Sequence, residues 1–350
     1  MNTFFLDRLN SEPHALAFAG QSTPWPVALA DQSANPALDE ALHTHAAAAQ
    51  ALLYPVSAEL LATTGRPVDL FGFEPNPARL GAAAAASASV PGIALTQLGA
   101  LLDAAALGYN PAQAKPVAVL GHSQGVLAVH MVQAICEAGS IDAAAAKIDE
   151  ILAIATLIGV AGTRQARQLG LAARHGEATP MLSVKDITRA QVDALIERVD
   201  GARGPIAVAV TNSATHYVLS GYPEDLAAFG VEVAKEHKRQ AKLREEKVRG
   251  GRVFDPTLEY LDVTLPFHSP LMADAVSQAV AWAEACGINA DHARELAAEV
   301  LLNHVDWAAR VRALMKSTDP GALWVLDFGP GATVGKLFST VAQGTGVGVV

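Results

Sequence analysis

A serine on a predicted tight turn between a strand and a helix constrains the fold of this chain more than any other feature. Residues 116–125 read PVAVLGHSQG, an apolar run that ends in a Gly-x-Ser-x-Gly motif, and residues 126–134 continue as VLAVHMVQA, a helical pattern. A serine on such a turn crowds its neighbours, and Gly121 and Gly125 remove the side chains that would clash. A plain turn is the structural alternative. The strand before the motif and the helix after it favour Ser123 as an exposed nucleophile at the C-terminal edge of a sheet.

The remaining pattern predicts an α/β fold with a largely parallel sheet, because strands alternate with helices along most of the chain. Alanine-rich, apolar-periodic stretches predict helices, and short β-branched runs predict strands. The helices are expected at 37–62, 126–137 and 272–285, and the strands at 116–120, 206–210, 217–220 and 323–326. The alanine run at 82–88 is low in complexity and is expected to be a mobile helix or loop.

The interval from about 181 to 265 follows a different order: strand, helix, strand, hairpin, helix, strand. This is the split βαβ pattern of a ferredoxin-like unit. We therefore predict an inserted ferredoxin-like subdomain at 181–265. Residues 1–180 and 266–350 are predicted to form one large, α/β-hydrolase-like subdomain.

Composition narrows the function classes. The chain has 350 residues, of which 51% are hydrophobic, so a sizeable core is expected. A net charge of −10 argues against nucleic acid as a partner. Only Cys136 and Cys286 are present, too few for a disulfide framework or a zinc site, so no metal is predicted and a reducing cytoplasm fits best. The N-terminus lacks the pattern of a secretory signal, and the apolar stretch at 151–160 is too short to span a bilayer, so no membrane association is expected.

A serine nucleophile needs a base, and histidine is the usual one because its pKa lies near neutrality. Of the 11 histidines, His268 lies in VTLPFHSPLM, at the end of a strand and just before a helix, where it can reach the same sheet edge. His304, in LNHVDW, is the rival. His122 is adjacent to the serine and is expected to point away from it and support the loop. For the other histidines the structural interpretation is preferred.

A second apolar strand that ends in a glycine turn lies near the N-terminus, in ALAFAGQSTPW at 15–25. If this strand lies beside the nucleophile strand, the backbone N–H of Gln21 could bind the oxyanion of a tetrahedral intermediate together with the N–H of Gln124. Alone, the segment is only a strand end.

Three motifs in one order resemble the malonyl-CoA:acyl-carrier-protein transacylase family: GQS at 20–22, GHSQG at 121–125 and FHSP at 267–270. The match looks closer still to the N-terminal acetyltransferase domain of actinobacterial-type, type I fatty acid synthase. The segments AFAGQSTPW, SVPGIALTQ, GHSQGVLAV, LIGVAGT and KVRGGRVFDP carry that likeness. The resemblance covers nearly the whole chain and is far more specific than the serine motif alone.

The resemblance implies a role for each matching residue. Ser123 would be the nucleophile and His268 the general base. The backbone amides of Gln21 and Gln124 would form the oxyanion hole. A main-chain carbonyl near Asn303 would orient the imidazole. This carbonyl would take the place of the carboxylate in the usual triad.

One departure from the family pattern bears on the cargo. Malonyl-transferring members carry an arginine that pairs with the free carboxylate of malonyl, and Ile158 occupies that place here. An uncharged acyl group, acetyl, is therefore expected. Arg164 and Arg167 are one to three helical turns away and are not expected to substitute. The resemblance further implies substrate-binding roles for Asn212, in the predicted hairpin, and for Arg249.

The predicted reaction is ping-pong transfer of acetyl from acetyl-CoA to the phosphopantetheine thiol of an acyl carrier protein, without a permanently bound cofactor. Other domains of a fatty acid synthase multienzyme are expected partners. A malonyl or palmitoyl transferase, a serine esterase of the α/β-hydrolase class and a non-enzymatic docking domain are the alternatives. The basic run KEHKRQAKLREEKVRGGR at 235–252 fits either a solvated helix face or a contact with CoA, the carrier or a neighbouring domain.

Overall fold

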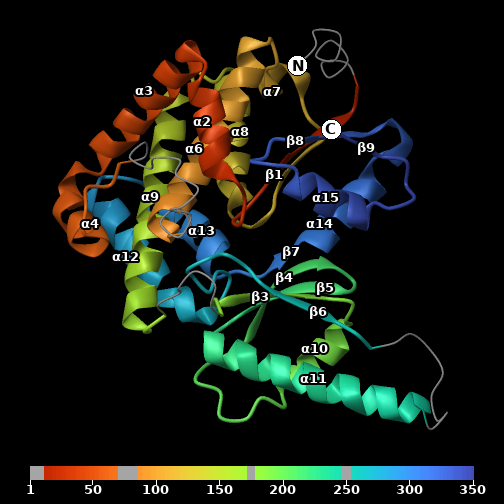
Figure 1. Cartoon of the computed structure of the whole chain (residues 1–350). Coiled ribbons are helices and arrows are strands. Elements are labelled where there is room, and N and C mark those ends of the chain that lie inside the picture. Colours follow the sequence, from red (N-terminus) through yellow and green to blue (C-terminus); the bar gives the residue numbers. More distant parts are fainter. Residues whose placement is uncertain (1–11, 70–84, 172–177, 246–253) are drawn as a thin grey trace.

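The computed structural model describes residues 12–69, 85–171, 178–245 and 254–350. In these residues the chain forms two sheets, each with its own helices (Figure 1). The α/β class with a parallel sheet and a second, smaller subdomain, predicted from the alternation of strands and helices, is confirmed.

The first sheet is parallel throughout, in the order β2-β1-β8-β9. The central strand β1 pairs with the strand that leads to Ser123, with Phe18 opposite Gly121. All five residues of β1 are buried, as expected for a strand covered on both faces. The strands are β1 (His14–Phe18), β2 (Ala118–Gly121), β8 (Trp324–Asp327) and β9 (Gly348–Val349).

Helices surround this sheet (Figure 1). They are α2 (Trp25–Ser33), α3 (Pro36–Leu52), α4 (Ser57–Thr64), α6 (Ala86–Ala106), α7 (Pro111–Ala114), α8 (Val126–Ala138), α9 (Ala145–Gln168), α12 (Ala273–Ala285), α13 (Ala290–Leu301), α14 (Trp307–Ser317) and α15 (Thr333–Val341), with short 3-10 turns at Tyr54–Val56, Ser123–Gly125, Pro270–Met272 and Pro320–Ala322.

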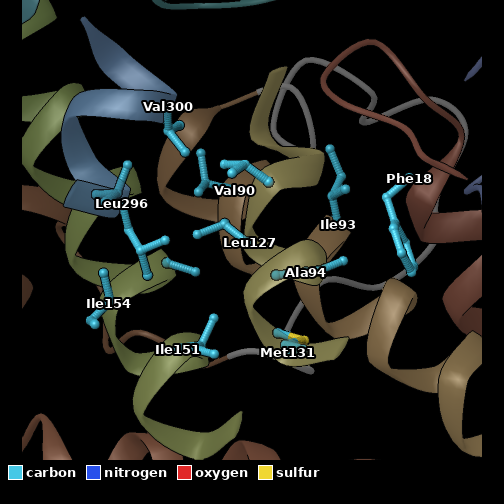
Figure 2. Packing of buried hydrophobic residues seen from close by; sticks show 14 of the residues in the cluster. Phe18, Val90, Ile93, Ala94, Leu127, Met131, Ile151, Ile154, Leu296 and Val300 are labelled. Carbon is cyan, nitrogen blue, oxygen red and sulfur yellow. The ribbon is translucent and has the colours of Figure 1, made fainter. Parts of the chain in front are cut away.

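The main hydrophobic core lies where α6, α8, α9 and α13 pack together (Figure 2). Val90 and Ile93 of α6, Leu127 of α8, and Ile154 of α9 are 0–1% exposed. Glycines allow this close approach: a Cβ on Gly159 of α9 would lie 2.3 Å from the carbonyl oxygen of Ala86. The nucleophile helix α8 is thus held in a fully packed environment.

The second sheet has the order β6-β3-β5-β4-β7. Its first four strands pair antiparallel, in the order expected of a ferredoxin-like unit. A separate small core, which includes Leu182, Leu219 and Phe229, fills the space between this sheet and its two helices. The elements are β3 (Met181–Lys185), α10 (Arg189–Ile196), β4 (Ala207–Ser213), β5 (His216–Ser220), α11 (Pro223–Glu245), β6 (Thr257–Tyr260) and β7 (Val305–Asp306).

Strand β7 joins the second sheet from far along the chain, since it pairs parallel with β4 through Val210↔Val305 and Thr211↔Asp306. It lies outside the interval 181–265 that the sequence pattern predicts for the inserted subdomain. The domain boundaries 1–180, 181–265 and 266–350 remain a prediction. Strand β7 shows that the chain after residue 265 pairs with a strand of the inserted segment.

Three expectations from sequence need correction. The single helix at 37–62 is two helices, α3 and α4, with a 3-10 turn at Tyr54–Val56, because Pro55 has no N–H to continue a helix. In the alanine run at 82–88, residues 82–84 lie outside the described residues. Ala86 and Ala88 begin α6 and are 0% exposed, so this part is core rather than a mobile surface segment.

The third correction concerns apolar length. Within the described residues, α6 is the one helix long and apolar enough to cross a membrane by length and composition, and it is longer than the apolar stretch at 151–160. In the folded protein 78% of that apolar window is buried, which is the behaviour of a core helix.

Candidate active site

Ser123 lies on a strained turn between β2 and α8. Its φ is +55°, a left-handed conformation that is unfavourable for a residue with a side chain. The two motif glycines make the turn possible. A Cβ on Gly121 would lie 2.4 Å from the backbone nitrogen of Val126, and one on Gly125 would lie 2.3 Å from the carbonyl oxygen of Phe18. The tight strand-to-helix turn predicted from the motif is therefore present.

His268 faces the serine. Its Nε2 lies 2.7 Å from Ser123 Oγ, and its Nδ1 lies 2.8 Å from the backbone carbonyl oxygen of Asn303. A carbonyl can only accept, so Nδ1 carries the proton and Nε2 is left to accept the hydroxyl proton of Ser123. The geometry is that of a nucleophile and a general base whose ring is oriented by a backbone carbonyl.

The loop that carries the histidine is anchored to the end of α13. His268 also has a positive φ, +57°, and the next residue donates its N–H to the carbonyl of Leu301 at 3.1 Å. Two strained residues, one on each side of the hydrogen bond, are thus held by the packing around them.

Burial favours the neutral form of the base. His268 is 2% exposed, and this desolvation lowers its pKa to about 3, against the opposing effect of its hydrogen bond to Asn303. Electrostatic interactions with His122, His304 and Arg310 lower it further. The imidazole is therefore neutral, and able to accept a proton, at neutral pH.

The turn after β1 lies directly against the nucleophile, because a Cβ on Gly20 would be 2.8 Å from Ser123 Cβ and 3.3 Å from Ser123 Oγ. The side chain of Gln21 donates a hydrogen bond to the side chain of Gln124, whose own amide donates to the carbonyl of Val90 at 3.2 Å. The two residues predicted to provide oxyanion donors therefore lie side by side. Strand β1 does pair with the nucleophile strand, the condition on which that prediction depended.

The rival histidine is occupied elsewhere. His304 Nδ1 donates to the carbonyl of Val208 at 2.8 Å, and its Nε2 lies 3.3 Å from Thr211 Oγ1. Both partners are on β4. The geometry therefore favours His268 over His304 as the partner of Ser123.

His122 points away from the serine, as expected, and its Nε2 lies 2.8 Å from Asn212 Oδ1. Asn212 is 4% exposed, which places it inside the structure rather than on an open substrate surface. Burial lowers the pKa of His122. Arg249 lies outside the described residues.

Ile158 is on α9 and is 0% exposed. The same face of α9 reaches the loop of the base, because a Cβ on Gly162 would lie 2.4 Å from Leu265 Cδ1, three residues before His268. Arg164 donates to the side chain of Gln278, and Arg167 donates to the carbonyl of Thr63. Both arginines therefore have partners away from Ile158.

The basic run at 235–252 is described only as far as residue 245. In that part, Glu236 accepts hydrogen bonds from Arg239, Gln240 and Arg198, and Arg239 lowers the pKa of its carboxyl to about 2. Lys235 pairs with Glu232. Much of this charge is therefore engaged in ion pairs along α11, as in the solvated-face interpretation.

Two residues near the nucleophile were not predicted from sequence. Arg310 Nη1 donates to the carbonyl of Gly121 at 2.9 Å, and the Trp307 ring packs edge-on against His122 with centroids 5.4 Å apart. Both belong to α14. An exposed arginine and a buried tryptophan on a helix carry no sequence signal that would connect them with a serine nearly 190 positions earlier.

A cavity of about 520 Å³ lies away from these groups, between α2, α6 and the turn after β8, and Gln32, Thr96 and Pro330 are among its lining residues. Neither Ser123 nor His268 lines it. Within the described ranges, no cluster of three or more His, Cys, Asp or Glu side chains is placed to hold a metal ion.

Residues 180–260 match the family described as the fatty acid synthase central AT domain. The fatty acid synthase beta subunit TOXC of Cochliobolus carbonum is 27% identical over 308 residues, which are 76% of this chain and 14% of that protein. The chain thus resembles the acyltransferase domains of fatty acid synthases. It spans only about a seventh of the length of this relative.

Solved structures of the malonyl-CoA:acyl-carrier-protein transacylase family share the fold of this acyltransferase-like chain. MCAT from Mycobacterium tuberculosis superposes with a TM-score of 0.61 at 19% identity, covering 96% of both chains. A type II polyketide synthase malonyl-transacylase, solved in complex with its acyl-carrier protein, gives 0.59 at 17% identity, covering 96% of this chain and 94% of that one. The resemblance predicted from the three motifs is confirmed, and at these identities the structural likeness concerns the fold.

Proposed function

We propose that this protein is an acyltransferase that moves an acetyl group from acetyl-CoA to the phosphopantetheine thiol of an acyl carrier protein, through an ester on Ser123. The observation that carries the proposal is the relay from Ser123 Oγ to His268 and on to the backbone carbonyl of Asn303. The similarity to acyltransferase domains of fatty acid synthases supports acyl transfer as the reaction of this pair of residues.

In the first half-reaction, His268 Nε2 takes the proton of Ser123 as Oγ attacks the thioester carbon. The backbone N–H groups of Gln21 and Gln124 are proposed to bind the oxyanion. When the intermediate collapses, the C–S bond breaks and the imidazolium returns its proton to the CoA thiolate. In the second half-reaction the carrier thiol gives its proton to His268, attacks the ester and restores the serine hydroxyl.

Acetyl is proposed as the cargo because Ile158 stands where malonyl-transferring relatives carry an arginine. An alkyl side chain cannot pair with a malonyl carboxylate. Burial of that carboxylate without a partner would cost several kcal/mol of desolvation free energy. The contact between Gly162 and Leu265 supports a place for α9 beside the acyl site.

Malonyl transfer is the second candidate, since the solved acyltransferase bound to an acyl-carrier protein is named a malonyl-transacylase. Intact-protein mass after mixing with acetyl-CoA or malonyl-CoA separately tests both. We expect an acetyl adduct to form faster than a malonyl adduct. A faster malonyl adduct would overturn the acetyl assignment, and no adduct with either donor would overturn the ester mechanism.

The proposed selectivity can be changed at one position. Ile158→Arg should raise malonyl transfer and depress acetyl transfer, because a buried guanidinium lacks a partner when the cargo has no carboxylate. Acylation rates for both donors, in wild type and variant, are the measurement. An unchanged ratio would mean that residue 158 does not line the acyl pocket. Ile154→Arg, one turn earlier on α9, tests whether any buried arginine has the same effect.

The carrier and the remaining synthase domains are proposed partners. Their support is the named partner of the structural relative and the fatty acid synthase likeness. A carrier loaded with phosphopantetheine should discharge the Ser123 ester, whereas the same carrier without it should not. Rapid discharge by water alone would instead indicate a serine esterase. The cytoplasm is the proposed location.

A further inference from the structure

The nucleophile turn is contacted on one side by α14. Arg310 donates to the carbonyl oxygen of Gly121 at 2.9 Å, and Trp307 packs edge-on against the ring of His122. These two residues are three positions apart and therefore lie on one face of the helix. The residues immediately before Ser123 are thus held by a helix that begins 184 positions later.

The same turn is bonded to the second sheet. His122 Nε2 lies 2.8 Å from Oδ1 of Asn212, which is an acceptor, so the imidazole N–H donates. Asn212 belongs to β4 and is 4% exposed. His122 also donates its backbone N–H to Phe18 and accepts at its carbonyl from Gly125. Its backbone and side chain are therefore both restrained.

These contacts close a ring around the catalytic pair. Strand β4 pairs with β7, where Thr211 stands opposite Asp306, and β7 runs directly into α14. Just before β7, the carbonyl of Asn303 holds the ring of His268 at 2.8 Å. The segment 303–310 therefore supports the base through Asn303 and the nucleophile turn through Trp307 and Arg310.

We propose that Asn212 and Arg310 are positioning residues that hold the Ser123 turn in register with His268. The proposal rests on the acyltransfer function proposed above. Asn212 acts through His122 and Arg310 through Gly121, so neither needs to touch the acyl group. In this assignment Asn212 connects the second sheet to the nucleophile, rather than binding substrate as the family resemblance implies.

The physical reason lies in the strain of the turn. Ser123 holds a positive φ, and a turn in that conformation relaxes unless its surroundings restrain it. A misplacement of about 1 Å between nucleophile and base can lower a rate by about a hundredfold. Removal of one of two restraints should therefore reduce the rate of attack while substrate binding is retained.

The experiment uses Arg310→Met, an exposed residue that can be changed without disturbing the core, and Asn212→Leu, which keeps the branched shape and the number of side-chain heavy atoms but removes the acceptor. Two rates are measured: acylation by acetyl-CoA, and inactivation by a small alkyl fluorophosphonate. In the second reaction Ser123 Oγ forms a bond to phosphorus, fluoride leaves, and His268 takes the proton. This reagent reports nucleophile geometry without any contact to CoA.

We expect both variants to lose about tenfold in the maximal acylation rate and in the fluorophosphonate rate, with the KM for acetyl-CoA within about twofold of wild type. Arg310→Lys and Asn212→Asp, which retain a donor and an acceptor, should recover part of the loss. Arg312→Met, an exposed arginine two positions along α14, is the matched control and should change neither rate.

Variants that react with the fluorophosphonate at the wild-type rate would overturn the proposal, and so would a loss confined to KM. If Asn212→Leu does not fold, the Arg310 pair decides the outcome. A wild type that reacts with the fluorophosphonate but never forms an acyl adduct would contradict the proposed function instead. In that case the positioning roles are still tested by the fluorophosphonate rates.

Discussion

The two sheets of this protein differ in burial and in what they contribute to the site. In the parallel sheet, β1 is buried along its whole length, and the turns after β1 and β2 place Gly20 against Ser123 and Gln21 beside Gln124 at one sheet edge. In the second sheet, three of the four residues of the edge strand β6 are exposed. Within the described residues, no side chain of that sheet forms a hydrogen bond with the Ser123 side chain. Its contribution is Asn212 and the pairing with β7.

The difference shows how a strained nucleophile is maintained. The parallel sheet is covered on both faces and supplies the rigid turn that carries the reactive group. The second sheet packs its own helices α10 and α11 against one face (Figure 1), and its strand β4 contacts α14 and α15 of the large subdomain, so this sheet can support the turn and the base. The following changes test this division between a reactive and a supporting sheet.

The largest effect is expected from Ser123→Ala, which should abolish the acyl adduct because the hydroxyl that faces His268 is lost. Intact mass after incubation with acetyl-CoA is the measurement. A stable adduct on the variant would mean that the nucleophile is another residue, and that the parallel sheet does not carry the reactive group.

His268→Ala should lower the acylation rate by about a hundredfold or more, the usual size of a lost general base. His304→Ala is the matched comparison. In the described part of the chain, the ring of His304 forms hydrogen bonds to residues of β4 rather than to Ser123. The His304 substitution should therefore have the smaller effect. Stopped-flow acylation rates distinguish the two, and a larger loss in the His304 variant would show that His268 is the wrong base.

Glycine substitutions should separate the two regions by stability. Gly125→Ala places a Cβ 2.3 Å from the backbone of Phe18, so backbone must move, and we expect about 1–3 kcal/mol of destabilisation together with lost acylation. Gly230→Ala, in α11 of the second subdomain, meets only Leu258 Cδ1 at 3.6 Å. It should stabilise the protein by up to about 1 kcal/mol and leave acylation unchanged.

Urea unfolding of both variants provides these values. Equal destabilisation by the two substitutions would mean that the nucleophile turn is no more tightly packed than an ordinary helix. A stabilised but inactive Gly230 variant would mean that the second subdomain acts on chemistry by a route other than Asn212 and β7.

The smallest effect is a pH dependence of stability. Burial lowers the pKa of His216 to about 4 and of His268 to about 3, and it also lowers the pKa of His14, His122 and His130. Below pH 6.5 these histidines take up protons in the unfolded chain but stay neutral in the folded chain. The free energy of unfolding should therefore be largest above pH 6.5 and should decrease as the pH falls toward 4 and then 3.

Glu299 and Asp327 have raised pKa values and act in the opposite direction at the acid end, so the upper part of this window is the cleanest. Urea midpoints between pH 7.5 and about 5.5 are the measurement. His216→Asn should flatten the slope, since it removes from the second sheet one half-buried histidine with a lowered pKa. A flat profile in wild type would contradict the neutral state of these side chains.

Local patterns in the sequence were sufficient for the turn at Ser123 and for the order of the second subdomain. The Gly-x-Ser-x-Gly run demands two glycines because of contacts within a few residues, and periodicity distinguishes strands from helices over similar distances. The break in the segment 37–62, which the alanine-rich pattern predicts as one helix, also has a local cause, because Pro55 cannot continue the helix.

The residue patterns favoured His268 but left His304 as its rival for the base, and the tertiary structure brings His268 to Ser123. The choice depends on where loops separated by 145 positions meet, and hydrogen bonds at 2.7 and 2.8 Å resolve it. Trp307, Arg310 and β7 are also visible only in the fold, because residues that act by touching a distant backbone leave no periodic or motif signal. Sequence alone determined the tight turn that carries Ser123 and the α/β architecture, which follow from local sterics and patterning, whereas long-range packing determined which side chains lie beside Ser123.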